Sequence, residues 1–287
     1  MSHRIVLEAG RTERQYWRDL WRYRELFYFL AWRDFMVRYK QTAVGVSWSL
    51  IRPVLTMTVL AVTVKLVNSP TGGAPAALFV FAAMLPWQFF STAMAESGMS
   101  LVTNSNLLTK VYFPRLVMPV SAVIVTLADF LISLAFMVVM FAVFRYLPSW
   151  RLAFLPAFLL MVFAAAVGTG LWMAALMVKY RDVRFIVQFM VQFGLYASPV
   201  LMMSSKVPTW WHEWVPARAL YSLNPAVGII DGFRWCLLRD EPAFVALGQS
   251  HQIYWPGMAV SVTVVVVLLF TGVMYFRRME RTFADNI

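Results

Sequence analysis

Six stretches of this sequence are long and apolar enough to cross a lipid bilayer, and this feature restricts the chain to a helical membrane fold. A helix needs about 20 mostly apolar residues to cross about 30 Å of hydrocarbon. The candidate spans are residues 44–67, 76–99, 116–144, 152–178, 185–203 and 256–276. Hydrophobic residues make up 61% of the chain and charged residues only 14%, unlike a soluble domain. We therefore predict an all-α membrane protein with six transmembrane helices.

The distribution of Lys and Arg predicts how these helices are oriented. Of the 25 basic residues, 17 fall in segments 1–42, 101–116, 179–184 and 277–287, and six fall in segments 68–75, 145–151 and 204–255. Cytoplasmic loops of membrane proteins carry such an excess of basic residues. We therefore expect both termini in the cytoplasm. The same bias explains the net charge of +11, so no nucleic acid partner is predicted.

The N-terminal segment before the first span mixes aromatic and basic residues. Between Tyr16 and Tyr39 it alternates Trp and Phe with Arg. This composition is typical of an amphipathic helix in the membrane interface, with aromatic rings at the acyl boundary and Arg among the headgroups. Such a helix could be a membrane anchor alone, or it could also contact a cytoplasmic partner.

The long segment 204–255, expected outside, is rich in Trp, Tyr and Pro. Its apolar stretch from Ala226 to Leu238 is too short to span, which favours a re-entrant or interfacial helix. Re-entrant backbone is tolerated only where protein or water covers it. An aromatic belt at the membrane surface is the alternative reading.

Patterns typical of catalysis are missing from the sequence. The three histidines lack metal-ligand spacing, and neither HExxH, GxSxG nor the phosphate loop GxxxxGK[ST] occurs. The acids nearest to span interiors are Glu96 and Asp129, and acids in such places are functional candidates. We expect Asp129 to be paired or to line an aqueous path. Two acids do not make a proton relay, and an embedded enzyme would need more clustered catalytic groups, so we predict a transport protein that is not an enzyme.

Five local sequences resemble the permeases of ABC type 2 polysaccharide exporters, and most closely the O-antigen (lipopolysaccharide) branch. The likeness runs in order along nearly the whole chain. The segments are RYKQTAVGVSWSLIRP (38–53), NSNLLTKVYFPRLVMP (104–119), KYRDVRFIVQFMVQFGLYASPVLMMSSKVP (179–208), LYSLNPAVGIIDGFRW (220–235) and FADNI (283–287).

The resemblance implies a homodimer paired with two copies of a cytoplasmic nucleotide-binding subunit. ATP and Mg would bind to that subunit, and no cofactor to this chain. The cargo would be an undecaprenyl-linked polysaccharide that crosses the bacterial inner membrane; capsule, teichoic acid, lipid or drug is the alternative. The chain would comprise a cytoplasmic N-terminus (1–42), a transmembrane domain (43–276) and a cytoplasmic tail (277–287).

The resemblance also implies contacts with the ATPase subunit. Segment 104–116 would form the coupling helix, in which Lys110 and Arg115 could meet acidic partner residues. A tight amphipathic turn on lipid headgroups is the alternative. The expected coupling residues are Asn104, Leu107, Lys110, Tyr112, Phe113 and Arg115, with Arg33, Asp34, Arg38 and Tyr39 from the N-terminal helix.

At the outer face the resemblance implies a periplasmic gate over residues 206–240. Two re-entrant helices, roughly 208–219 and 225–238, would be separated at Asn224 and Pro225, because Pro disfavours helix in the residue before it. Gly228 and Gly232 would allow another helix to approach closely. The length of segment 206–221, with Trp210, Trp211 and Trp214, departs from the family pattern.

A polysaccharide path would need aromatic rings, which pack on the apolar faces of sugars without fixing one register. The candidate channel residues are Trp87, Phe89, Phe90 and Tyr196, although each could simply pack within the bundle. A lipid pyrophosphate headgroup would prefer cationic groups at the inner entrance. Arg38, Lys40 and Arg52 are the candidates for that role.

Overall fold

The computed structural model describes residues 18, 20–40, 47–105, 107, 113–207, 216–240, 245 and 251–280. Throughout these residues the regular elements are helices. Five of them are long and apolar enough to cross a membrane: α3 (Ser47–Leu66), α4 (Ala76–Thr103), α6 (Val117–Val143), α7 (Leu155–Lys179) with the short helix η1 (Trp150–Phe154) before it, and α12 (Trp255–Glu280). The all-helical membrane fold predicted from the sequence is thus observed.

The span expected at 185–203 is a shorter helix, α8 (Val183–Ala197). Its 15 residues extend about 22 Å, less than the roughly 30 Å of a bilayer core. After Ala197 the chain leaves the helical conformation until η2 (Ser204–Lys206). The described helices therefore include five of full spanning length rather than the six expected.

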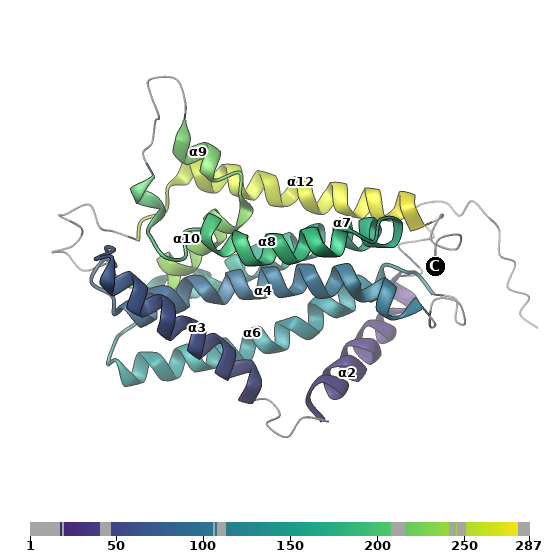
Figure 1. Ribbon diagram of the computed structural model, residues 1–287, viewed down its shortest axis with the longest axis horizontal. Coiled ribbons are helices and arrows are strands. Elements are labelled where there is room, and N and C mark those ends of the chain that lie inside the picture. Colours follow the sequence, from purple (N-terminus) through teal and green to yellow (C-terminus); the bar gives the residue numbers. More distant parts are fainter. Residues whose placement is uncertain are drawn as a thin grey trace, which may run out of the picture.

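Helix α4 forms the centre of the bundle (Figure 1). Five other helices pack against it: α3, α6, α7, α8 and α10 (Pro225–Leu237). Of the 18-residue apolar window of α4, 83% is buried, whereas the windows of the other four spans are 22–39% buried. Helix α4 is therefore enclosed by protein, and the other spans leave apolar surface for lipid or for other subunits.

Helices α7 and α12 approach each other closely at two glycines. A Cβ atom on Gly168 would lie 2.7 Å from the backbone nitrogen of Leu269, and one on Gly272 would lie 2.4 Å from the Gly168 carbonyl oxygen. Small residues permit such contacts in membranes, where association depends on close packing rather than on burial from water. Helices α7 and α12 therefore form a tight pair.

Helix α2 (Arg24–Lys40) lies oblique to the bundle and packs on α6 (Figure 1). Leu30 and Ala31 are buried, whereas Tyr28, Phe29 and Trp32 are more than half exposed. The rings of Tyr28, Trp32, Phe35 and Tyr39 follow one another along the helix, 4.7–6.3 Å between successive centroids. Placement of this helix in a membrane interface stays a prediction.

The segment before α12 contains two short helices, α9 (Ala217–Tyr221) and α10, near the end of the bundle that the sequence predicts to be periplasmic, which we call the outer end. The break between them at residues 222–224 falls beside the expected Asn224–Pro225 junction. The Asn224 side chain accepts a hydrogen bond from the Ala226 N–H at 3.1 Å, and Pro225 occupies the first turn, where its missing N–H costs nothing. The start of α10 is thus explained by its own residues.

Candidate functional site

A polar cavity lies between α2, α3, α4 and α6, within the part of the bundle expected to face the cytoplasm. Its volume is about 320 Å³. Its polar lining comes from four helices: Arg38 and Tyr39, Ser49 and Arg52, Gln88, Thr92 and Glu96, and Thr126, Asp129 and Ser133. The rings of Phe89 and Phe130 complete the wall. Its lining thus combines hydroxyl, amide and charged groups with aromatic rings.

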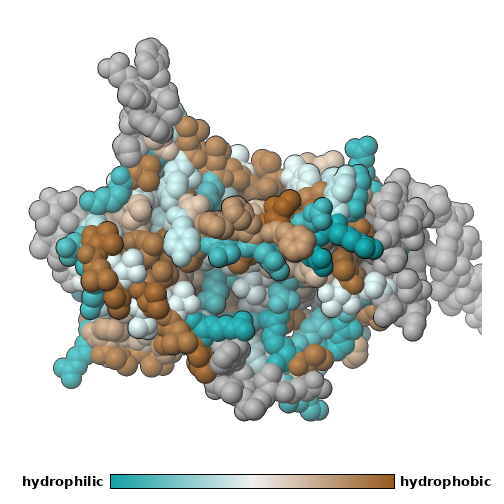
Figure 2. Space-filling view, viewed as in Figure 1, coloured by the Kyte–Doolittle hydropathy of each residue, from teal (hydrophilic) through white to brown (hydrophobic). Residues whose placement is uncertain are grey.

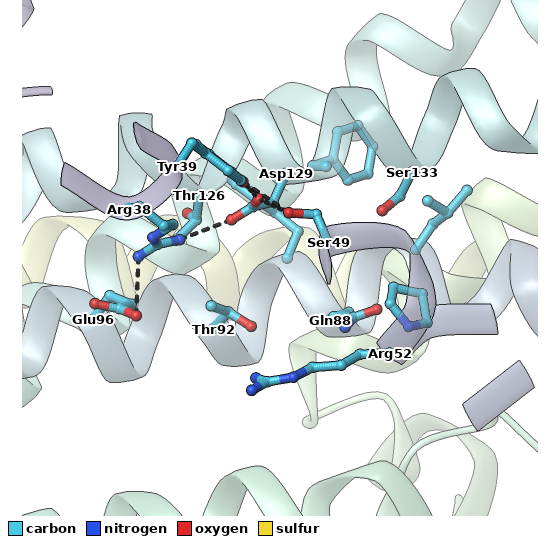
Figure 3. Close-up of a pocket in the computed structure, with 14 residues that line it drawn as sticks. Arg38, Tyr39, Ser49, Arg52, Gln88, Thr92, Glu96, Thr126, Asp129 and Ser133 are labelled. Atoms are coloured by element: carbon cyan, nitrogen blue, oxygen red, sulfur yellow. Dashed lines mark hydrogen bonds and ion pairs between the residues drawn. The ribbon is translucent and has the colours of Figure 1, made fainter. Parts of the chain in front are cut away.

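Arg38 lines this cavity and joins two helices through their acids. Its Nη1 lies 2.8 Å from Asp129 Oδ2 on α6, and its Nη2 lies 3.0 Å from Glu96 Oε1 on α4. Figure 3 shows the guanidinium of Arg38 reaching between these two carboxylates. Arg38 was expected at an ATPase contact or a lipid headgroup, and both roles stay predictions; in the structure its partly exposed side chain bridges α4 and α6.

Asp129 also accepts hydrogen bonds from two hydroxyl groups. Tyr39 OH donates to its Oδ1, and Ser49 Oγ donates to the same oxygen at 2.9 Å (Figure 3). Asp129 lies twelve residues into α6, about 18 Å along the helix. A charge at that depth is expensive unless it is paired or hydrated. Asp129 is paired with Arg38, as the first alternative expected, and it also lines the cavity; an aqueous path through the cavity stays a prediction.

A second recess continues from Arg38 and Glu96 toward the end of α4. Its volume is about 500 Å³, and it lies between α2, α4 and the first turns of α6. Arg33 and Asp34 stand at its edge: Arg33 Nη2 is 2.7 Å from Asp34 Oδ1 and donates to Asn104 Oδ1 at 3.1 Å. The N-terminal helix is thereby tied to the first residue of segment 104–116.

Segment 104–116 is partly described. Leu107 packs partly buried against the core, Phe113 is 6% exposed, and Arg115 is hydrogen-bonded to Glu280 at the end of α12. Lys110 and Tyr112 lie outside the described residues. Arg115, expected to meet an acidic partner residue, thus has an acidic neighbour within its own chain.

The aromatic residues expected to line a channel are in two different environments. Trp87, Phe89 and Phe90 are 3–7% exposed, and Phe89 packs edge-on against Phe130 with their centroids 5.5 Å apart. Tyr196 on α8 is 65% exposed. Within a single chain only Tyr196 of these four is open to a large ligand, while Phe89 contributes to the polar cavity.

The exposed face of α8 carries a polar row and an aromatic row. Arg184, Gln188, Gln192 and Tyr196 recur every four residues and are all exposed, and so are Phe185, Phe189 and Phe193 in the adjoining row. Residues four apart lie on the same face of a helix. Figure 2 shows hydrophilic residues gathering in a recess between α8 and α3, on the face turned to the viewer. Sequence reasoning singled out Tyr196 alone; the four-residue spacing was the signal for the rest.

At the outer end, Arg234 on α10 is a functional candidate that sequence reasoning did not single out. It is 2% exposed, and its guanidinium donates to the carbonyls of Pro199 (2.5 Å), Val200 (2.7 Å) and Met202 (2.9 Å). It also lies over the Phe79 ring at 3.7 Å. The signal that could have identified Arg234 from the sequence is a basic residue within the short apolar stretch from Ala226 to Leu238.

Arg234 explains why α8 can end early. Backbone carbonyls outside a helix need donors wherever water is absent. The five donors of a guanidinium can serve several carbonyls of the non-helical stretch 198–203 at once. Asn224 adds a hydrogen bond from its Nδ2 to Ser198 Oγ at 3.2 Å. The expected break residue thus also anchors the end of α8.

The other residues expected in an outer gate are only partly described. Gly228 and Gly232 contact neighbours closely: an added Cβ would lie 2.5 Å from Ser261 Cβ at the first and 2.1 Å from Phe158 Cε1 at the second. Trp210, Trp211 and Trp214 lie outside the described residues. His251, just before α12, is buried, and its backbone N–H donates to Asp240 Oδ1 at 2.7 Å. Burial, and secondarily the nearby Arg234, lower the pKa of His251 to about 4.

In the described ranges, no group of three or more His, Cys, Asp or Glu side chains could hold a metal ion. Lys40 is exposed at the end of α2, outside the polar cavity, whereas Arg52 on α3 lines it. The structure therefore brings together Arg33, Asp34 and Asn104 in one place and Arg38, Arg52 and Phe89 in another.

Comparison with known proteins shows the same family along most of the chain. Residues 25–238 match the ABC-2 type transporter family. The chain is 29% identical to the O-antigen export system permease protein RfbA of Myxococcus xanthus, over 94% of this chain and 98% of that protein. It is 23% identical to proteins of the same name from Klebsiella pneumoniae, over 91% of this chain and 94% of each relative.

Proposed function

The chain belongs to the ABC-2 type transporter family and is a transport component, not an enzyme; on this premise we propose that it is the permease subunit of an ATP-driven exporter of an undecaprenyl-linked polysaccharide of O-antigen type. The observation that carries the proposal is the end-to-end similarity to an O-antigen export permease, over 94% of this chain. The five long apolar helices agree with a multi-pass protein of the bacterial inner membrane.

The energy source in this proposal is a separate nucleotide-binding subunit present in two copies, which holds ATP and Mg. The sequence lacks a phosphate loop, so nucleotide hydrolysis has to come from a partner. Segment 104–116 is the proposed coupling contact. Its support is the Arg33–Asn104 hydrogen bond, which joins this segment to α2 and would let both move with a docked partner.

The exposed face of α8 supports a homodimer enclosing a polar path. Lipid tails offer no partner to Gln188 and Gln192, and an unpaired amide in hydrocarbon is costly. Two copies that face each other across α8 would keep these amides in a water-filled passage. Tyr196 and the Phe row would then face the same passage.

A sugar polymer suits the two rows of α8 chemically. Amide and hydroxyl groups exchange hydrogen bonds with sugar hydroxyls, while Phe189 and Phe193, with their ring centroids 4.2 Å apart, offer apolar faces to the sugar CH groups. Weak contacts repeated along a helix allow a polymer to enter and to leave, as conduction requires. The proposed polysaccharide path therefore runs along α8, with Trp87 and Phe90 supporting it from inside the bundle.

The lipid pyrophosphate is proposed to approach through the polar cavity at Arg38 and Arg52. Arg38 is already paired with Glu96 and Asp129, so a phosphate that binds there has to exchange places with a carboxylate. That exchange would loosen α2 from α4 and α6. Lys40, exposed beside the cavity mouth, is the third proposed cation.

At the outer side we place the gate at α9 and α10, with Asn224, Pro225, Gly228 and Gly232 setting the helix break and its packing. The three Trp residues at positions 210, 211 and 214 belong to the same proposed gate. Both termini are proposed to be cytoplasmic, in keeping with the distribution of Lys and Arg.

A second cargo class, such as capsule, teichoic acid, lipid or drug, is the competing proposal, because one fold serves many cargoes. The names of the relatives favour the O-antigen type. Deleting the gene in its host tests the choice. We expect lipid-linked polysaccharide to accumulate on the cytoplasmic side; unchanged polysaccharide at the cell surface would refute the proposal.

A further inference from the structure

Arg115 at the end of segment 104–116 is joined to Glu280, the last residue of α12, by two reciprocal hydrogen bonds. The backbone N–H of Arg115 donates to Glu280 Oε1 at 2.9 Å, and Arg115 Nη1 donates to the Glu280 backbone carbonyl at 2.9 Å. Each bond combines a side chain of one residue with the backbone of the other. We call this pair the Arg115–Glu280 clasp.

The chemistry of the clasp suits the start of α6. Helix α6 begins at Val117, and the N–H groups at a helix start lack partners and favour a carboxylate such as that of Glu280. Phe113, Leu116 and Phe276 are buried in the same part of the chain. The contact therefore lies beside packed apolar residues.

The opposite end of α12 contacts the outer pair of helices. Ser261 Oγ donates to the carbonyl of Ser222, which directly follows α9, at 2.8 Å. Gly228 of α10 faces the same serine, where an added Cβ would lie 2.5 Å from Ser261 Cβ. The 26 residues of α12 extend about 39 Å. One straight helix thus touches segment 104–116 at one end and both α9 and α10 at the other.

Between its ends α12 packs along α7, and its extended contacts within the described chain are limited to α7, α9 and α10. The backbone contact at Gly168 and Gly272 makes α7 and α12 a stiff pair. Within the described chain α12 makes no extended contact with α4 or α6, and the clasp is a hydrogen-bonded link from α12 to the segment between those two helices.

We propose that α12 transmits movement of segment 104–116 to α9 and α10, and that Arg115 and Glu280 are the positioning residues that engage it. This inference rests on the proposed function, in which segment 104–116 contacts the ATPase and α9 and α10 form the outer gate. Breaking the clasp should then separate ATP hydrolysis from export without abolishing hydrolysis.

The test uses the full chain co-expressed with its nucleotide-binding subunit, purified and reconstituted in vesicles with lipid-linked polysaccharide. Arg115→Met and Glu280→Leu each remove one bond of the clasp. Arg115→Lys keeps a cationic donor, and Glu280→Gln keeps an acceptor oxygen, so these are the matched controls. We expect export to fall about tenfold in the first two variants and the controls to export close to wild type. In Glu280→Leu, whose residue lies outside the proposed ATPase contact, ATP hydrolysis and co-isolation should stay within about twofold of wild type.

Three results would overturn the inference: wild-type export by Arg115→Met and Glu280→Leu, equal loss in the matched controls, or a parallel loss of hydrolysis and export in Glu280→Leu. Ser261→Ala removes the contact at the other end of α12 and covers the case in which the clasp variants do not fold. It should lower export without lowering hydrolysis, and unchanged export would overturn the inference as well. Failure of the wild-type chain to co-isolate with any nucleotide-hydrolysing subunit would refute the proposed function instead.

Discussion

Replacing Arg234 with methionine should destabilise the outer end of the bundle more than any comparable change of a surface arginine. Met fills much of the same volume but donates no hydrogen bond. The carbonyls of Pro199, Val200 and Met202 would lose donors at 2.5–2.9 Å, in a place where Arg234 itself is only 2% exposed. The contact with Phe79 would also lose its charge.

The magnitude follows from the burial of these groups. Removing one partner from a buried charged network costs about 3–5 kcal/mol, because the groups left behind keep their desolvation cost. The whole free energy of unfolding of a typical domain is about 5–15 kcal/mol, so Arg234→Met should remove a large part of it. Arg234→Lys should fall between Met and wild type, because an ammonium has three donors and no planar fork.

Unfolding of the purified chain by SDS in mixed micelles, followed by Trp fluorescence, measures this loss. Arg151→Met is the matched control: Arg151 also lies at the outer end, is 22% exposed, and pairs with Asp240 at 2.9 Å. It should cost about 1–2 kcal/mol, because a partly exposed pair is screened by solvent. Equal losses for Arg234→Met and Arg151→Met would refute the argument from buried carbonyls.

Three further predictions concern the polar cavity, the α7–α12 contact and His251. Arg38→Met should lower the free energy of SDS unfolding by about 2–3 kcal/mol. The double variant Arg38→Met with Asp129→Leu should recover part of this loss, because it leaves fewer unpaired groups. No recovery in the double variant would argue against the ion pair. Gly168→Val should lower the free energy of unfolding by about 3 kcal/mol or more, because it forces a side chain onto the α12 backbone. Ala259→Leu, on the exposed face of α12, should lower it by under about 1 kcal/mol. Equal losses in the two variants would contradict the close packing of α7 and α12. Folding lowers the pKa of His251 from its ordinary value of 6.5 to about 4, so between these pH values the unfolded chain binds more protons than the folded chain. The free energy of unfolding should therefore fall as the pH drops from 6.5 toward 4. His251→Gln should flatten this pH dependence, and an unchanged pH dependence would assign the effect to other groups.

Much of the fold could be predicted from the sequence because apolar length decides which segments cross a bilayer. The helices α4, α6, α7 and α12 begin and end within about four residues of the expected spans. The early end of α8 could not be predicted, because the residues that replace its helical hydrogen bonds come from α10, about 35 positions later in the chain. The hydropathy of the mostly apolar residues 198–203 predicts a continued span. It contains no information about a distant arginine that donates hydrogen bonds to their carbonyls.

The candidate site was predicted by residue type more than by position. The sequence singled out Asp129 and Glu96 because acids near span interiors are uncommon. It named Arg38 for other roles, a contact with the ATPase subunit and a cation for a lipid headgroup. The association of these three residues required the packing of α2 against α6, which no local pattern specifies. Arg115 was expected to meet an acidic residue of another subunit, which stays a prediction, and its hydrogen bonds to Glu280 of the same chain could not be predicted from any local pattern.

Vesicles that contain the chain and lipid-linked polysaccharide, with and without the nucleotide-binding subunit, would provide the decisive measurement. The quantity to follow is the fraction of polysaccharide that becomes accessible on the side opposite that subunit, probed with an added glycosidase. We predict transfer only when both subunits and hydrolysable ATP are present. Equal transfer by the chain alone, or without ATP, would show that it is not the passive half of an ATP-driven pair.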